Sequence, residues 1–495
     1  MGSMSLSQLA QGLADVPPAL ATVPIEDLTL DSRCVDVGSG FVAIQGLEND
    51  GRKFIGEAFA RGATVVFAES EGADKGEALY ADARVINVPK LKAKVGDLAK
   101  RFYADPSSHM HLLAVTGTNG KTSITDYMGQ LLRLLGGSAG TIGTLGARSF
   151  SGEAAETQNT TPDIISLNRQ LAAWVDQGVN YVAIEASSHA LDQNRLAGLT
   201  VHTGVFSNLS RDHLDYHRDM TAYQRAKMRL FDEFKLKQVI FNADDDFTHP
   251  ASGFGAHSAV GISLRDAGAD VFAQVLSESA SGMTLQLHSP FGSSRVPTNL
   301  HGRFNAFNIV AAITAVCGLG FGFKEVAAAA SFVRPVDGRM QAVNAGEDIR
   351  VVIDYAHTPD ALDNALRSLA VATAGDLWVV FGCGGDRDSG KRPEMGRVAA
   401  SLASKIIVTN DNPRTEDAQV IANQVMEGVQ GKDVVVELDR ALAIRLAITS
   451  AHSGDTVLIA GKGHESYQTI GTERLVCSDA EHARQALRER EVGHV

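Results

Sequence analysis

The sequence predicts an α/β protein built from three domains, and three observations support this prediction. At 495 residues the chain is too long for one compact core, because domains average about 100–200 residues. Short apolar runs recur along the chain, each followed by polar residues and a helical pattern, as in parallel sheets covered by helices. A glycine-flanked loop over 117–120 joins one such run to a helical segment, which is the layout of a phosphate-binding loop.

The pattern places the three domains in order along the chain. We expect a small N-terminal α/β domain over 5–105 and a central phosphate-loop ATPase domain with a mostly parallel sheet over 106–335. A C-terminal, Rossmann-like and doubly wound domain should cover 336–495. Met1–Ser3 resemble an expression remnant ahead of a natural start at Met4 and are left out of fold reasoning.

The first domain shows strands and turns without a catalytic cluster of its own. Phe41–Ile44 and Thr64–Phe67 are short apolar runs that predict strands, and 56–62 between them has helical character. Asp105–Ser108 is rich in turn-forming residues and predicts a linker into the central domain.

Composition narrows the class of protein. The 45 Lys and Arg residues against 58 Asp and Glu give a formal net charge of −13, which argues against a nucleic-acid or membrane-surface binder. The cysteines show no paired metal spacing and fit a reduced, cytoplasmic protein. The sequence shows no secretory leader and no apolar run of membrane-spanning length. We therefore expect a cytoplasmic protein that binds neither nucleic acid nor membrane. A monomer is a separate expectation, on which the composition is silent.

The loop after the apolar run Leu112–Thr116 carries residue types that bind phosphate. Its glycines let backbone N–H groups close around phosphate oxygens, and the following helix points its positive N-terminus at the same place. Lys121 would contact the terminal phosphates, and Thr122 would offer a hydroxyl to Mg²⁺. The loop is one residue shorter than the common GxxxxGK[ST] motif, so a plain glycine-rich turn is the alternative. The predicted nucleotide-binding residues here are Gly117, Thr118, Asn119, Gly120, Lys121, Thr122 and Ser123.

Three further side chains of the central domain are candidates for chemistry. Glu185 follows the apolar run 181–184, at the sheet edge where ligands bind, and is a candidate Mg²⁺ ligand or a solvated loop carboxylate. His213 lies in a segment dense in imidazole and carboxylate, and is either a metal-site residue or a solvated histidine. Lys227 has helical context, where lysines usually extend to solvent.

The third domain repeats the pattern of a strand followed by a polar loop. Apolar runs at 351–353, 377–381, 406–408 and 457–459 predict strands. The loops after them deliver Arg, Lys, His and Glu to one edge, which predicts a site for a charged small molecule. These loops read Asp354-Tyr355-Ala356-His357, Gly382-Cys383-Gly384-Gly385-Asp386-Arg387, Asp411-Asn412-Pro413-Arg414 and Gly461-Lys462-Gly463-His464-Glu465.

Taken together, these motifs resemble the Mur ligase family of ATP-dependent enzymes that build the peptide stem of the bacterial cell wall. The resemblance covers about 28–465 and all three domains. It is carried by the phosphate loop, Glu185-Ala186-Ser187-Ser188-His189, His213-Leu214-Asp215-Tyr216-His217, Lys227, His301-Gly302-Arg303-Phe304-Asn305 and Asp337-Gly338-Arg339. Asp31-Ser32-Arg33, Asn159-Thr160-Thr161, Asp354 to Asp360 and Gly384 to Asp388 are similar to the ligases that add the third residue to UDP-N-acetylmuramoyl-L-alanyl-D-glutamate.

The resemblance implies an amide-bond ligase that activates the D-glutamyl γ-carboxylate as an acyl phosphate, with ATP and Mg²⁺ as cofactors. Activation is chemically necessary because a carboxylate is a poor electrophile. Thr122 and Glu185 would hold one Mg²⁺, and His213 with a carbamylated Lys227 would help to position a second. The catalytic set is therefore Lys121, Lys227, His213 and Glu185. Asn305 and Arg339 match positions that contact ATP, and Asp354 is a weaker candidate for the ribose.

The resemblance also assigns residues to the two other substrates. The uridine end would contact Leu30, Ser32, Leu47, Glu48 and Asn49, where the side chains of 47–49 depart from the histidine-bearing version of other members. The sugar and peptide end would contact Asn159, Thr160, Thr161, Ser187, Gln193 and Arg195. The incoming amino acid would contact Arg387, Asp411, Asn412, Pro413, Arg414, Gly461 and Glu465.

Arg414 predicts which amino acid is added. meso-Diaminopimelate carries a carboxylate that L-lysine lacks, and a guanidinium can bind it through two parallel hydrogen bonds. In the family that the chain resembles, members that add diaminopimelate carry an arginine at this position. The resemblance therefore implies that Arg414 binds this carboxylate and that Glu465 pairs with the distal ammonium. Without the resemblance, 411–414 would equally be a turn fixed by Asn-Pro with Arg414 in solvent.

Four alternatives remain at this point. A lysine-adding ligase of the same family is disfavoured by Arg414, and a folate-polyglutamate ligase is disfavoured by the Asp31-Ser32-Arg33 domain. A nucleotide-switched binding protein would hydrolyse ATP slowly and independently of any amino acid. A metal-independent scaffold would leave Thr122, Glu185 and His213 without a shared purpose.

Overall fold

A computed structural model describes residues 2–46, 49–70, 82–152, 154–157, 159–248, 258–279, 282–344 and 348–493 of the chain. The predicted uridine-contact residues Leu47 and Glu48 lie outside these ranges. The chain divides into two compact units. The first consists of 1–114, 136–204 and 229–237, and the second of 115–135, 205–228 and 238–495.

The first unit contains a parallel four-stranded sheet in the order β3-β4-β5-β6. The predicted strands at 41–44 and 64–67 are confirmed within it. The core on this sheet joins Phe41 and Val66 to Ile55 and Ala58 of the helix α2. The elements are β3 (Asp27–Thr29), β4 (Ser39–Ala43), β5 (Val65–Glu69), β6 (Val85–Val88), α1 (Leu6–Leu9), α2 (Ile55–Ala60) and α3 (Leu91–Phe102).

The rest of the first unit brings a second set of strands. β11 pairs in parallel with β8, and β8, β9 and β10 follow one another as antiparallel neighbours. The predicted linker at 105–108 is a packed 3-10 helix (Pro106–His109), in which Pro106 and Ser107 are buried. The other elements are β8 (Ala139–Gly143), β9 (Gly146–Arg148), β10 (Ala154–Ala155), β11 (Tyr181–Glu185), α5 (Ile164–Asp176) and α6 (Ser188–Asp192).

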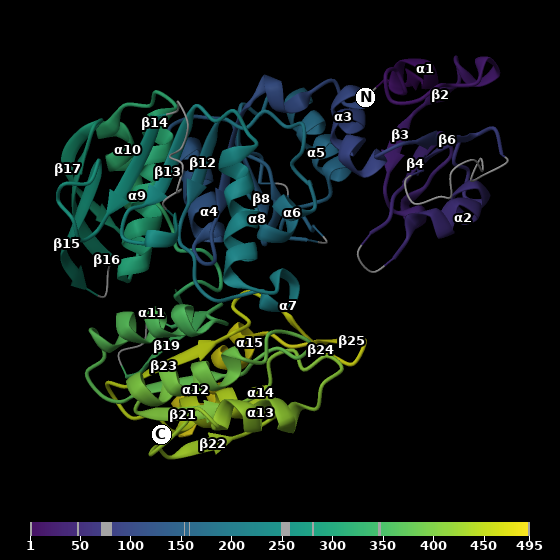
Figure 1. The fold of residues 1–495 in the computed structure, drawn as a ribbon. Helices are drawn as coiled ribbons and strands as arrows, with labels where there is room; N and C mark the ends of the chain where they lie inside the picture. The colour runs from purple at the N-terminus through teal and green to yellow at the C-terminus, as the bar shows by residue number, and fades with distance from the viewer. Residues whose placement is uncertain are drawn as a thin grey trace. The chain divides into compact units, whose positions relative to one another are not determined.

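The second unit begins at the end of β7 (His111–Thr116) with α4 (Lys121–Leu134), which packs against α9 (Arg303–Gly318). β13 (Gln238–Asn242), β14 (Ser258–Ser263) and the start of β15 (Val271–Ser279) pair in parallel. β15, β16 (Gly282–Ser289) and β17 (Gly292–Thr298) then form an antiparallel extension that sequence analysis did not predict. Figure 1 shows these strands beside α9 and α10 (Phe323–Ala329).

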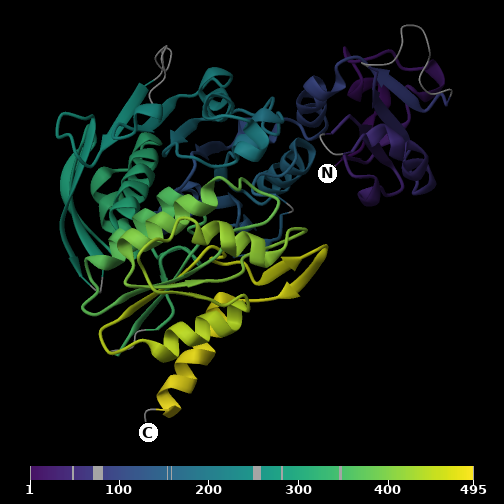
Figure 2. The ribbon, with the colours of Figure 1, turned by 60° about the horizontal axis from the view of Figure 1, so that its bottom comes forward.

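The C-terminal part of the second unit is the doubly wound layer that the sequence predicts. Its sheet has the order β18-β19-β23-β20-β21-β22, parallel except at β18. Val352 and Phe381 face a core formed with α11, α12 and α13, whereas Val351 and Val380 face a core formed with α14 and α15. Figure 2 shows these two groups of helices on opposite sides of the sheet. The elements are β18 (Gln341–Ala342), β19 (Arg350–Asp354), β20 (Leu377–Phe381), β21 (Lys405–Val408), β22 (Val434–Val436), β23 (Thr456–Ala460), α11 (Pro359–Ala370), α12 (Lys391–Leu402), α13 (Ala418–Met426), α14 (Arg440–Ser450) and α15 (Asp479–Gly493).

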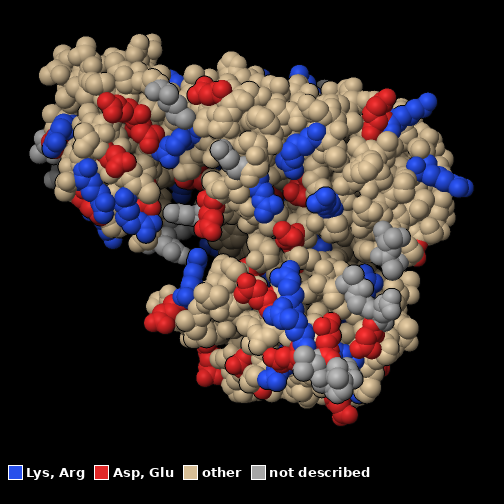
Figure 3. All heavy atoms as spheres, turned by 180° about the vertical axis from the view of Figure 1, so that it is seen from behind, with Lys and Arg blue, Asp and Glu red and all other residues tan. Residues whose placement is uncertain are grey.

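Three observations bear on the class of protein. On the face drawn in Figure 3, acidic and basic side chains are interspersed, without a continuous blue surface. Among the described residues, no helix combines the length and apolar character needed to cross a bilayer. All four cysteines, Cys34, Cys317, Cys383 and Cys477, are free thiols.

Candidate active site

The phosphate loop lies between β7 and α4, as the sequence predicts. Gly117 and Gly120 have φ angles of +145° and +86°, which favour glycine. A Cβ atom at Gly117 would also collide with Ser207 Oγ. Ser207 follows β12 (Thr203–Phe206) and donates its backbone N–H to Thr116 O over 3.0 Å. The ends of two neighbouring strands therefore fix the loop, and only small residues fit there.

Two lysines converge on the carbonyl groups of this loop. Lys121 Nζ donates to Gly117 O and Thr118 O over 2.9 and 2.8 Å. Lys227, on α8 (Met220–Asp232), is buried and donates to the same Gly117 O over 2.6 Å. Burial, and then the charge of Lys121, hold the pKa of Lys227 well below its usual value. Lys227 is thus an enclosed amine at the loop, and the expectation that a lysine with helical context extends to solvent is wrong for it.

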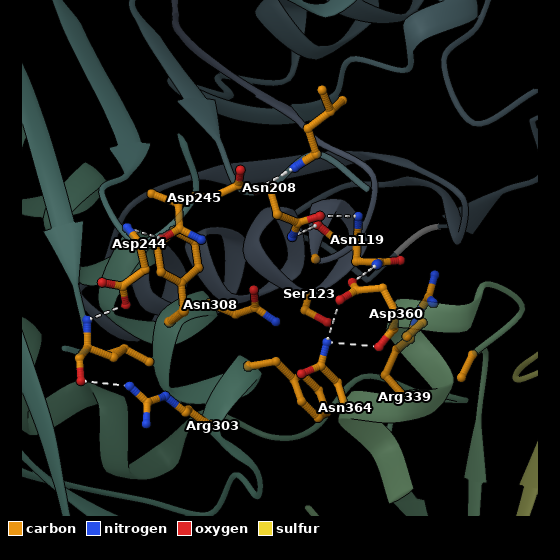
Figure 4. Close-up of a pocket in the computed structure, with 18 of the residues that line it drawn as sticks. Asn119, Ser123, Asn208, Asp244, Asp245, Arg303, Asn308, Arg339, Asp360 and Asn364 are labelled. Carbon is orange, nitrogen blue, oxygen red and sulfur yellow. Dashed lines mark hydrogen bonds between the residues drawn. The ribbon is translucent and has the colours of Figure 1, made fainter. Parts of the chain in front are cut away.

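A cavity of about 460 Å³ opens beside the loop. It is lined by Asn119, Gly120, Thr122 and Ser123 of the loop and by Arg339 and Asp354 of the C-terminal part (Figure 4). Asn119 donates from Nδ2 to Asp360 Oδ2 over 2.9 Å, and from its backbone N–H to Asn208 Oδ1 over 2.9 Å. The predicted phosphate loop and the predicted ATP residue Arg339 therefore share one cavity.

Asn305 does not line this cavity. It is buried in α9, where its Nδ2 donates to His301 O and its Oδ1 accepts from Tyr127 OH and Asn308 Nδ2. Asn308, one helical turn further on, lines the cavity together with Arg303, Phe304 and Phe307 of the same helix (Figure 4). Asn305 thus supports a lining residue from behind, and its direct contact with ATP stays a prediction.

Arg339 links the phosphate loop to the C-terminal sheet. Its Nη2 donates to Thr122 Oγ1 over 3.2 Å, and its guanidinium carbon lies 4.3 Å from the centre of the Tyr355 ring. Asp354, at the end of β19, accepts from Met340 N over 2.7 Å. Burial raises the pKa of Asp354 from its usual value, against the charge of Arg339.

Asp212 is a buried carboxylate on which three basic side chains converge. His213 Nε2 lies 3.3 Å from Asp212 Oδ2, His357 Nε2 lies 3.5 Å from the same atom, and Lys391 Nζ lies 3.7 Å from Oδ1. Burial alone would raise the pKa of Asp212, but the hydrogen bond to His357 and the charges of His213, His357 and Lys391 hold it well below its usual value. His213, at φ +53°, is therefore fixed by an ionised neighbour.

Glu185, in the first unit, is almost completely buried and is no solvated loop residue. Its Oε1 accepts from Thr144 N over 2.8 Å, and its Oε2 accepts from Thr144 Oγ1 over 3.2 Å. Thr161 Oγ1 donates to the backbone carbonyl of Glu185 over 2.6 Å. A Cβ at Gly143 would collide with the carboxylate, so the glycine makes room for it.

A second cavity, of about 1090 Å³, lies within the first unit. Its lining includes six predicted substrate residues: Leu30, Ser32, Asn49, Asn159, Gln193 and Arg195. Arg195 Nη1 donates to Thr161 O over 2.9 Å, and Ser187 Oγ caps α6 by accepting from Ala190 N over 3.2 Å. Thr160 Oγ1 accepts from Thr144 Oγ1 over 3.3 Å. Residues predicted for both ends of the UDP substrate thus meet around one cavity, whereas Thr160, Thr161 and Ser187 are not part of its lining.

The predicted amino-acid residues gather at the carboxyl edge of the C-terminal sheet. Asn412 Nδ2 donates to Glu465 Oε2 over 3.0 Å, and a Cβ at Gly461 would lie 2.6 Å from Asp411 Oδ2. Arg414 adopts φ +51° and donates from Nη1 to Gly385 O over 2.6 Å. Burial, followed by the charge of Arg387, lowers the pKa of Arg414. Arg414 is half-buried, so it is not a solvent-exposed turn residue. Pro413, between Asn412 and Arg414, is buried.

A two-stranded hairpin holds the loop 411–414 in place. Arg414 N donates to Thr469 O over 3.1 Å, and Gly471 N donates to Arg414 O over 2.7 Å. Gln468 Nε2 donates to Asp411 O over 2.7 Å. The hairpin consists of β24 (Tyr467–Ile470) and β25 (Glu473–Val476), and it fixes the backbone from which the arginine extends.

Within the part of the chain that the structure describes, no group of three or more His, Cys, Asp or Glu side chains is arranged to hold a metal ion. Thr122 in the second unit carries a hydroxyl and Glu185 in the first unit a carboxylate, both oxygen donors of the kind that Mg²⁺ prefers, and their ligation of one ion stays a prediction. Sequence reasoning missed Asn308, Asp212 and Lys391 because their roles depend on contacts between distant segments.

Three family models match the chain. They are described as "Mur ligase family, catalytic domain" over 24–103, "Mur ligase middle domain" over 115–316, and "Mur ligase, glutamate ligase domain" over 338–463. A protein of Alkalilimnicola ehrlichii named UDP-N-acetylmuramoyl-L-alanyl-D-glutamate–2,6-diaminopimelate ligase is 43% identical over 479 residues, covering 94% of this chain and 96% of that protein. A protein of the same name from Pseudomonas aeruginosa is 43% identical over 493 residues, covering 99% of both.

Solved structures give the same result. One described as the structure of that same ligase aligns with a TM-score of 0.70 at 35% identity and covers 99% of both chains. The MurF ligase from Thermotoga maritima in complex with ADP aligns with a TM-score of 0.64 at 16% identity, covering 95% of this chain and 99% of that one. The second likeness shows the fold alone.

Replacing Asp212 by Asn tests the buried charge cluster. The substitution leaves Lys391 without a buried counter-charge, so we expect the free energy of unfolding at pH 7 to fall by about 3 kcal/mol. Because the folded-state pKa of Asp212 is depressed, the stabilisation is present above its usual value of 3.8 and is lost only as pH falls through the lower, folded value. Urea unfolding between pH 8 and pH 5 should therefore show a difference that does not shrink.

Asp363→Asn is the matched control, because Asp363 forms an exposed pair with Arg367 and should change stability by less than about 0.5 kcal/mol. If the difference in the free energy of unfolding between the wild type and D212N disappears between pH 7 and pH 5, Asp212 is not the stabilising counter-charge of this cluster.

Proposed function

The chain belongs to the Mur ligase family, and on that premise we propose that it adds meso-2,6-diaminopimelate to the D-glutamyl γ-carboxylate of UDP-N-acetylmuramoyl-L-alanyl-D-glutamate. ATP is converted to ADP and phosphate in the reaction. The observation that supports this most strongly is the position of Arg414 and Glu465 at the carboxyl edge of the C-terminal sheet. It is made in a chain that is 43% identical, over 99% of its length, to a protein named as a diaminopimelate ligase.

In the first step, a γ-carboxylate oxygen of the substrate attacks the γ-phosphorus of ATP, and ADP leaves. The chain's part is to hold the phosphates and offset their charge. Lys121 already lies at the loop carbonyls, from which its ammonium can turn to the stronger acceptors of a triphosphate. Asn308 and Arg339, which line the same cavity, are proposed to bind the rest of the nucleotide.

In the second step, the amine of the incoming amino acid attacks the carbonyl carbon of the acyl phosphate. The carbon–oxygen bond to phosphate breaks, phosphate leaves, and the amine loses a proton. We propose that Arg414 and Arg387 bind carboxylates of the amino acid and that Glu465 binds its distal ammonium. The fixed backbone of Arg414 at the hairpin favours one orientation of the bound amino acid.

Mg²⁺, when bound, neutralises charge that moves between the oxygens of ATP and the acyl phosphate. Thr122 and Glu185 are the residues proposed to hold one ion, and His213 with a carbamylated Lys227 are proposed to help position a second. The depressed pKa of Lys227 favours the neutral amine, which is the form that adds to carbon dioxide; the nitrogen–carbon bond forms and a proton is released. The UDP-linked end is proposed to occupy the cavity of the first unit. We place the reaction in the cytoplasm, where free thiols persist.

Replacing Arg414 by Ala tests the choice of amino acid. We expect kcat/KM for meso-diaminopimelate to fall by about 10- to 100-fold, because a charge-assisted bidentate contact is lost. The assay is phosphate release with ATP, Mg²⁺ and the UDP-linked dipeptide, with diaminopimelate and L-lysine compared in parallel. Arg397→Ala, which removes an exposed arginine of α12, should leave both rates unchanged.

If R414A keeps full diaminopimelate turnover, Arg414 is not the selector. Release by the wild type with lysine instead would favour the lysine-adding ligase, and release independent of any amino acid would favour a nucleotide switch.

Carbon-13 NMR tests the modification of Lys227. After equilibration with labelled bicarbonate, the wild type should show a carbamate signal that is absent from Lys227→Ala, because the enclosed neutral amine is the reactive one. Lys235→Ala, which removes an exposed lysine, is the control and should keep the signal. A carbamate signal unchanged in K227A would overturn the assignment.

A further inference from the structure

Beside the proposed amino-acid site lies a buried lysine that the proposed mechanism does not use. Lys462 follows β23, and its side chain is completely enclosed. Its Nζ lies 3.1 Å from Glu465 Oε2, 3.2 Å from Asn412 Oδ1 and 5.4 Å from the centre of the Tyr467 ring. A buried ammonium is costly unless it is paired, so Lys462 depends on Glu465 for its counter-charge.

The Glu465 carboxylate already accepts hydrogen bonds from three neighbouring side chains. Its Oε2 accepts from both Lys462 and Asn412 Nδ2, and its Oε1 accepts from Tyr355 OH over 3.3 Å. A carboxylate can accept about four hydrogen bonds, and the Glu465 side chain remains 17% exposed. Glu465 can therefore accept from a substrate ammonium, but Lys462 already neutralises its charge.

The surroundings add positive charge. A Cβ at Gly384 would lie 3.0 Å from Arg414 Nη1 and 3.8 Å from Arg387 Cγ, so the two arginines flank the same glycine. With Lys462, these are three cationic side chains, and the carboxylates of Asp411, Glu465 and Asp386 act on Arg414 with the opposite sign. Glu465 is the carboxylate to which Lys462 donates, so a ligand that brings only an ammonium meets a charge that is already balanced.

We propose that Lys462 is a specificity-determining residue that excludes amino acids whose side chain ends in an ammonium alone. This inference rests on the proposed function. The distal end of diaminopimelate carries an ammonium and a carboxylate, so it can satisfy Glu465 and Arg414 together without adding net charge. L-Lysine would bring its side-chain ammonium to Glu465, whose charge Lys462 already neutralises. The two ammonium groups would then repel each other, and L-lysine has no distal carboxylate that could bind Arg414 and offset this repulsion.

The test is a set of three substitutions at this position. Lys462→Gln removes the charge, while its amide can still donate to Glu465 and Asn412; Lys462→Met removes both, and Lys462→Arg keeps the charge. We expect the ratio of kcat/KM for diaminopimelate to kcat/KM for lysine to fall about tenfold or more in K462Q and K462M. The ratio should stay near the wild-type value in K462R. Lys405→Gln, which removes an exposed lysine of β21, is the control.

Thermal unfolding and KM for ATP, measured for each variant, separate specificity from folding. A K462Q that is folded, binds ATP normally and keeps the wild-type ratio overturns the inference, because Lys462 is then only structural. If K462M does not fold, the comparison of K462Q with K462R still shows whether the charge of Lys462 sets the ratio. If the wild type releases no phosphate with diaminopimelate, the proposed function has failed; if it does and only the ratio is unmoved, this inference alone has failed.

Discussion

The site depends on one constraint of parallel sheets: the residue that follows a strand is delivered to the carboxyl edge of the sheet. In the second unit, β7 delivers the phosphate loop, β12 delivers Ser207 and Asn208, and β13 delivers Asp244 and Asp245. The C-terminal sheet does the same with Asp354 after β19, Arg387 after β20, Arg414 after β21 and Glu465 after β23. Two sheets with this property therefore concentrate the polar chemistry of an otherwise acidic chain.

Concentrating charge in this way requires buried partners. Asp212 holds His213, His357 and Lys391, and Glu465 holds Lys462. Lys227 differs, because the Gly117 carbonyl it contacts is neutral. A buried lysine at a neutral partner tends to lose its proton. The basic neighbours of Asp212 therefore favour its ionised form, whereas burial beside a neutral carbonyl favours the neutral amine of Lys227.

Local patterns in the sequence were sufficient for much of this account. The strand before the phosphate loop, the helix after it and the four C-terminal strands all followed from apolar runs and their turns. The antiparallel extension β15–β17 was not predicted, because its strands alternate buried and exposed residues and lack the short continuous apolar runs of the buried parallel strands. The reach of Asn308 rather than Asn305 into the cavity depends on which side of α9 faces α4, and periodicity alone does not give this. The burial of Lys227 and Lys462 depends on tertiary packing, and a lysine in a helix or a loop carries no local sign of it.

The proposed mechanism activates the D-glutamyl γ-carboxylate as an acyl phosphate. The most direct test is to label that carboxylate with oxygen-18, run the reaction with ATP and diaminopimelate, and analyse the released phosphate by mass spectrometry. Attack of the carboxylate on ATP predicts one labelled oxygen in each phosphate released, because the carbon–oxygen bond breaks when the amine displaces phosphate. Phosphate without label, released alongside the amide product, would contradict the account.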